Sequence, residues 1–179
     1  MSIPVVVSII ADIVIILILV GAFIGGAKGG VFKEVVELIA FIIALLFAGT
    51  FLSMVYGWLA FIGNTGWQSF LAFLLTMGII IILVQLLLWL PRHLLEKLWN
   101  SGFIFGLLGG ILGIINASLG LVLLVRLLSV YEVLPWLSSI LATSHVLSWL
   151  ISVFGPFITS LTREVTYSGV TASIFSYVV

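Results

Sequence analysis

The sequence contains no cysteine and very little charge. Asp, Glu, Lys and Arg make up 7% of its 179 residues, whereas 64% are hydrophobic; a soluble domain carries about 25% charged residues. A folded chain with so little polar surface cannot cover itself in water, so the lipid bilayer is its solvent. The lack of cysteine excludes disulfides, thiolate metal sites, a thiol nucleophile and lipidation through sulfur.

An excess of either charge is also missing, because six basic and six acidic residues balance to a net charge of zero. The basic residues form no cluster, so nothing supports a nucleic-acid partner. The sequence has no HExxH, GxSxG or GxxxxGK[ST] motif, which removes the signals of a zinc protease, a serine hydrolase and a nucleotide-phosphate site. Asp12 is the only aspartate, which excludes a paired-aspartate intramembrane protease. We therefore expect no enzyme, no cofactor and no metal site.

Long apolar runs are what the sequence has in abundance. Four of them cover residues 3 to about 26, about 35 to 59, 70 to 90, and 102 to 128. Each is long enough to cross a ~30 Å hydrocarbon layer as a helix rising ~1.5 Å per residue. Pro91 should end the third run, because proline disfavours a helical conformation of the residue before it. The sequence predicts an all-α integral membrane protein whose residues 1–130 form about four transmembrane helices, the first retained rather than cleaved as a signal peptide.

Residues 131–179 differ in composition from the four runs. They are richer in Ser and Thr and contain Pro135 and the pair Gly155-Pro156, where we expect the chain to break. Residues 145–161 are only marginally long for a fifth, kinked span. We expect helices lying in the external membrane interface instead, with the fifth span kept as the alternative, and a tail that pairs as a strand or stays free.

The basic residues predict the orientation. Lys28 and Lys33 lie between the first and second runs, and Arg92 and Lys97 lie between the third and fourth. Four of the six basic residues therefore fall on one side, which the positive-inside rule makes cytoplasmic. We expect a multi-pass protein of the plasma membrane with both termini external.

Glycine is concentrated in two short segments that this topology brings to the same depth. The candidate helix-contact residues are Gly21, Gly25, Gly29 and Gly30 from the first segment and Gly106, Gly110 and Gly113 from the second. Glycines spaced about one turn apart leave bare backbone along one face, where another helix approaches closely. We expect the two segments to touch, either within one chain or between the chains of a homo-oligomer.

Few polar residues lie inside or beside the predicted spans. The intramembrane candidates are Asp12, Gln85, Asn116 and Arg126, and the interfacial charges are Lys28, Lys33, Glu34 and Glu37. A carboxylate inside a span costs roughly 2.5–3.5 kcal/mol on insertion scales. Asp12 is therefore either a proton or cation site, a structural partner of Arg126, or a group reaching an outer vestibule. We expect Gln85 and Asn116 to form interhelical hydrogen bonds, and Glu34 and Glu37 to lie at the N-terminal end of the second helix, where the helix dipole favours negative charge.

Two of these stretches resemble a known family. The opening of the colicin V production protein family resembles one stretch of this sequence. That stretch contains Asp12, the glycine-bearing span after it and the sequence Gly29-Gly30-Val31-Phe32-Lys33-Glu34. Residues 100–116, NSGFIFGLLGGILGIIN, are similar to the family's second signature. The resemblance covers residues 10–128 and leaves the tail outside. It departs where Gly29 replaces a usual basic residue, with Lys28 one place earlier, and where the second signature lacks its basic residue.

The resemblance implies a bacterial inner-membrane protein of about four helices, linked to colicin V production or export and to envelope physiology. In some relatives the membrane unit anchors an external protease domain. Two functional classes stay open: a scaffold or accessory protein acting through helix contacts with other membrane proteins, and a small channel or transporter that uses Asp12. The scarcity of intramembrane charge and the lack of matching broken helices favour the scaffold.

Overall fold

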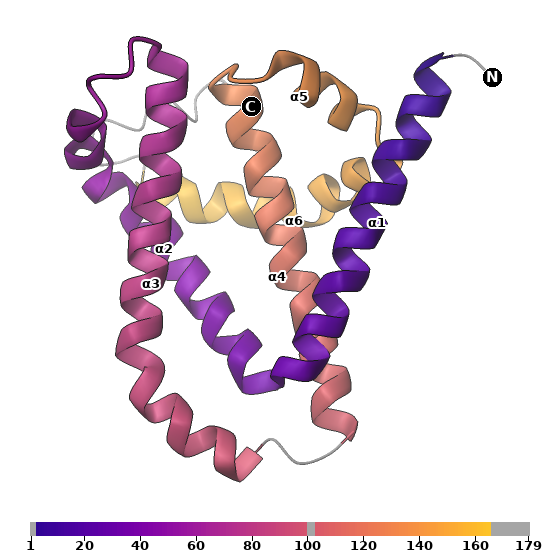
Figure 1. The fold of residues 1–179 in the computed structure, drawn as a ribbon, viewed down its shortest axis with the longest axis vertical. Helices are drawn as coiled ribbons and strands as arrows, with labels where there is room; N and C mark the ends of the chain where they lie inside the picture. The colour runs from indigo at the N-terminus through magenta and orange to yellow at the C-terminus, as the bar shows by residue number, and fades with distance from the viewer. Residues whose placement is uncertain (1–2, 100–102, 166–179) are drawn as a thin grey trace.

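The computed structural model describes residues 3–99 and 103–165, and these residues form helices and short turns without a strand (Figure 1). The helices are α1 (Ile3–Gly29), α2 (Val31–Trp58), α3 (Thr65–Trp99), α4 (Phe103–Val130), α5 (Pro135–Ala142) and α6 (His145–Val165). Four segments are long and apolar enough to cross a membrane, namely Val6–Gly29, Val31–Trp58, Thr65–Leu88 and Phe103–Val130. The prediction of an all-α protein with four long apolar helices is confirmed.

A single residue, Gly30, separates α1 from α2. Its backbone has φ 80° and ψ 163°, a combination that is essentially restricted to glycine. From this junction α1 and α2 diverge like the arms of a V (Figure 1). The two helices therefore pack little against each other: α1 packs mainly against α4, and α2 packs mainly against α3.

The long helices alternate in direction, so the bundle has two distinct ends (Figure 1). The Gly30 end holds the junction of α1 with α2, the C-terminal end of α3 and the start of α4. The α5 end holds the start of α1, the turn between α2 and α3, and α5 itself. The helix ends that carry Lys28, Lys33, Arg92 and Lys97 thus lie at one end of the bundle, as the sequence predicts. Which side of the membrane that end faces stays a prediction.

Two prolines do not break the chain where we expected. The third helix continues through Pro91 to Trp99, and α6 continues through Pro156 to Val165. Proline removes one backbone hydrogen bond, but a full break in an apolar environment leaves more backbone groups unsatisfied. In α6 the packing also holds both sides of Pro156, because Leu150 and Ile158 are almost completely buried.

The last two helices are bent sharply against each other. The chain turns by 92° between α5 and α6, and α6 then lies across the long helices (Figure 1). It contacts α4, α2 and α1, and its residues Leu147, Leu150 and Ile158 belong to the same buried core as α2, α3 and α4. The tail after Val165 lies outside the described residues, and whether residues 145–161 cross the membrane stays a prediction.

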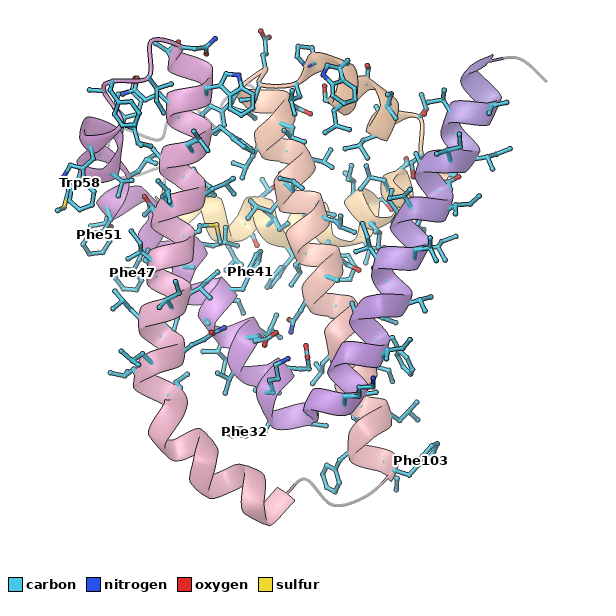
Figure 2. The ribbon with its side chains drawn as sticks, viewed as in Figure 1. Phe32, Phe41, Phe47, Phe51, Trp58 and Phe103 are labelled. Carbon is cyan, nitrogen blue, oxygen red and sulfur yellow. The ribbon has the colours of Figure 1, made fainter. Side chains whose placement is uncertain are left out.

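The outer faces of the long helices are apolar and exposed. Phe47, Phe51 and Trp58 project from α2 away from the bundle (Figure 2). On α1, Ile13 and Leu17 expose 51% and 63% of their surface. Such surfaces are compatible only with lipid or with a membrane partner.

Candidate functional site

Helices α1 and α4 approach each other backbone to backbone near the Gly30 end of the bundle. A Cβ atom added to Gly109 would lie 2.5 Å from the carbonyl oxygen of Gly26, and one added to Gly113 would lie 2.5 Å from that of Ala22. The added atom would meet backbone in both cases, so no side-chain rotation could relieve the clash. Only glycine fits these positions at the observed helix separation.

The predicted glycines of α4 all face α1. Gly113 contacts Ala22 and Gly26, Gly106 lies near Ala27, and Gly110 lies beneath the ring of Phe23. The second segment is thus on the predicted face, and Gly109, which we did not single out, is its closest contact. All three of Gly109, Gly110 and Gly113 are buried.

The sequence predicted that Gly21, Gly25 and Gly29 form the contact face of α1. For contacts within the chain, this prediction is wrong. A Cβ atom added to Gly21 or Gly25 would have nothing within 4 Å, and one added to Gly29 would meet only the side chain of Lys33. Ala22 and Gly26 make the contact instead, one residue further along. A shift of one residue turns the face by about 100° around a helix of 3.6 residues per turn. Gly30 contributes through its backbone, which lies beside Gly109.

A buried carboxylate lies between α2 and α4 at the same end of the bundle. Glu34 is 3% exposed, and Asn116 Nδ2 donates to the Glu34 carboxylate oxygen Oε2 at 2.9 Å and to its backbone oxygen at 3.0 Å. Lys33 Nζ lies 3.4 Å from Glu37 Oε1 and 4.0 Å from Glu34 Oε1. The sequence suggested Asn116 as an interhelical partner and Glu34 as an interfacial charge, without connecting them. One signal could have placed Glu34 inward: it precedes Leu45 by about three helical turns and so shares its buried stripe.

Asp12 holds the bend between α5 and α6. Its carboxylate oxygen Oδ1 accepts hydrogen bonds from Ser144 Oγ at 2.6 Å and from the Val146 backbone N–H at 3.1 Å. One turn earlier on α1, Ser8 Oγ donates to the Thr143 backbone oxygen at 2.7 Å. A carboxylate at the first turn of a helix satisfies free N–H groups and interacts favourably with the helix dipole. Asp12 therefore caps α6.

Arg126 of α4 reaches the middle of α6. Its Nη1 donates to Thr159 Oγ1 at 2.6 Å, and a Cβ atom added to Gly155 would lie 2.9 Å from Arg126 Nη2. The absence of a side chain at Gly155 therefore makes room for the guanidinium group. Of the three alternatives for Asp12, the pairing with Arg126 is wrong, because the two residues bind parts of α6 on the order of 20 Å apart along its axis.

The other polar residues form fewer hydrogen bonds among the described residues. Gln85 is exposed on α3, so the expected interhelical hydrogen bond is not formed among the described residues. The Tyr131 hydroxyl is buried without a hydrogen-bond partner in the described part of the chain, and burial raises the pKa of Tyr131 to about 12. No group of three or more His, Cys, Asp or Glu side chains that could hold a metal occurs in that part. The side chains of Arg92, His93 and Lys97 lie outside it.

Comparison with known proteins identifies a family. Residues 11–177 match the family model described as colicin V production protein. The match confirms the resemblance and extends past residue 128, through α5 and α6. No curated protein and no solved structure matches the chain.

Proposed function

We propose that this chain, which belongs to the colicin V production protein family, is a scaffold or accessory protein of the bacterial inner membrane that supports colicin V-type production and secretion and envelope maintenance. In this proposal it acts through helix contacts rather than as an enzyme. Its Gly30 end, which holds the basic helix ends, is cytoplasmic, and its termini are external.

The observation that carries this proposal is that Asp12 is hydrogen-bonded to α6. The Asp12 carboxylate binds Ser144 and the first turn of α6. A group that passes ions must exchange its protein partners for the ion or for water. Asp12 instead has two hydrogen bonds that hold α6 to α1, which supports a structural role for the charge. Arg126 likewise binds α6, through Thr159.

The open face of α1 supports a membrane partner. Gly21 and Gly25 lie one turn apart with nothing near them, beside the exposed side chains of Leu17 and Ile24. Exposed glycines at this spacing allow a second helix to approach the backbone. A second copy of the chain or a helix of another membrane protein are the partners that we propose for this face.

The test compares Asp12→Asn with Ser144→Ala, because both weaken the attachment of α6 to α1. Asn removes the negative charge at the first turn of α6, and Ala removes the hydroxyl that donates to Asp12 Oδ1 and accepts from the Leu147 N–H. Each variant replaces the native protein in cells that secrete colicin V. Toxin export and resistance to envelope-disrupting detergent are measured at matched protein levels. A scaffold predicts that both variants lose function in parallel with a fall in unfolding temperature in detergent. Ile13→Val, on the exposed side of α1, serves as the control and should retain function.

Flux measurements distinguish the scaffold from the alternative, a small channel or transporter. Liposomes containing the native protein should show the same proton and K⁺ leak as liposomes without protein. A flux that Asp12→Asn abolishes while Ser144→Ala retains it, with both variants folded, would overturn the scaffold proposal.

A further inference from the structure

The contact between α1 and α4 leaves a wedge between these helices. They touch near the Gly30 end, at Gly26 and Gly113, and diverge toward the α5 end, where α5 bridges the gap between them (Figure 1). The wedge contains a partly open cavity of about 470 Å³. The glycine contact and the capped bend at Asp12 together fix the walls of this cavity.

The cavity wall consists of apolar side chains. α1, α4, α5 and α6 all contribute, and the lining residues central to the argument are Val14, Ile18, Leu121, Leu124, Trp136 and Ile140. Water has no hydrogen-bond partner on such a surface, so it does not fill the cavity. If a space of this size were empty, the side chains that line it would have no dispersion contacts on that side.

The open side of the cavity faces the medium that surrounds the spans. Ile10 and Val14 line it and are 56% and 49% exposed, like the residues on the outer face of α1. Trp136 lies on the α5 side and is 61% exposed. Tryptophan favours the level of the lipid headgroups, so the cavity extends from that level along the hydrocarbon region.

We propose that this cavity binds one acyl chain of a membrane phospholipid, with the headgroup beside α5. The volume falls within the ~300–1,000 Å³ of ligand pockets. A membrane-length helix of a protein partner does not fit, because one helical turn about 10 Å wide and 5.4 Å long already occupies roughly 400 Å³. A narrow hydrocarbon chain can lie along the wedge instead. Because the bilayer is itself apolar, dispersion contacts with the walls, rather than the hydrophobic effect, retain the chain.

The test fills the cavity with larger side chains. In the double variant Val14→Phe/Ile18→Phe both substitutions face the cavity, whereas in Ile13→Phe/Leu17→Phe the same change, at the same spacing, faces outward. The proteins are washed extensively in detergent, and the phospholipid retained per chain is measured by native mass spectrometry. We expect one tightly held phospholipid in the native protein and in the outward variant, and its loss in the cavity variant.

A second measurement tests whether the acyl chain lies in the cavity. In a protein that keeps Trp136 and has phenylalanine at the other five tryptophan positions, lipids with brominated acyl chains should quench Trp136. Filling the cavity should reduce this quenching severalfold, whereas the outward substitutions should not. If the double cavity variant does not fold, Leu124→Phe on the opposite wall replaces it, with the exposed Leu108→Phe as its control.

Three outcomes would overturn the proposal. One is equal lipid retention by the folded cavity and outward variants. Another is quenching of Trp136 that is the same in both. The third is efficient disulfide cross-linking between copies through Ile10→Cys, because a second copy would then cover the opening.

Discussion

Replacing single glycines by alanine tests which face of α1 holds the bundle together. Gly26 and Gly113 lie in the contact between α1 and α4, whereas Gly25 and Gly120, on the same two helices, have nothing within 4 Å of an added Cβ. Alanine raises helix propensity by about 1 kcal/mol at each of these positions. At Gly113 it also places Cβ 2.5 Å from the Ala22 oxygen and 3.2 Å from the Gly26 Cα.

That overlap is with backbone, so the two helices must separate by at least about half an ångström, and overpacking of this kind costs about 1–3 kcal/mol. The propensity gain is common to all four variants and cancels in the comparison. We therefore expect Gly26→Ala and Gly113→Ala to be less stable than Gly25→Ala and Gly120→Ala by about 1–3 kcal/mol.

The free energy of unfolding is measured by titrating dodecyl sulfate into mixed micelles and following the far-ultraviolet circular dichroism. The matched pairs share a helix, so differences in micelle interaction largely cancel. If Gly25→Ala proves as destabilising as Gly26→Ala, the contact lies on the Gly21–Gly25 face that the spacing alone suggested. The assignment made from the structure would then be refuted.

Two further substitutions test the surroundings of this contact in the same unfolding assay. Gly30→Ala should cost about 1–3 kcal/mol, because alanine is strained at φ 80° and ψ 163°; destabilisation no larger than that of Gly25→Ala would contradict the strained junction. Asn116→Leu should cost about 1–3 kcal/mol because it leaves the buried Glu34 carboxylate without its amide donor, and Glu34→Gln in the same protein should recover part of this loss. An Asn116→Leu protein as stable as the native one would show that the hydrogen bond contributes nothing.

The helices were predictable from the sequence because membrane spans are defined by composition and length. Runs of apolar residues sufficed to locate α1 to α4, but they placed the junction of α1 and α2 only within residues 26–35, whereas a single residue, Gly30, forms it. The helix ends were less predictable. Pro91 and Pro156 looked like breaks because the rule for proline describes one missing hydrogen bond, whereas continuation depends on the packing on both sides.

The partners of the polar residues could not be predicted in the same way. Asp12 and Ser144 are 132 residues apart, and Asn116 and Glu34 are 82 apart. Pairing Asp12 with Arg126 followed from charge and approximate depth alone. It failed because the serine and backbone N–H groups of a helix start can satisfy a carboxylate as well as a counter-ion can. The direction of α6, which decides this, has no signature in the residues of α1.

The two charged contacts of α6 differ in kind, and together they account for its crosswise position. Asp12 binds the first turn, where both the free N–H groups and the dipole favour a negative charge. Arg126 binds at Gly155 and Thr159, well before the end of the helix at Val165. The dipole acts only within the last turn, so Arg126 contributes through its hydrogen bond and through the space at Gly155. Asp12 thus fixes where α6 begins, and Arg126 fixes where its middle lies. Because these contacts come from α1 and α4, two helices that diverge toward the α5 end, a helix held by both must extend across the gap between them rather than run beside either one.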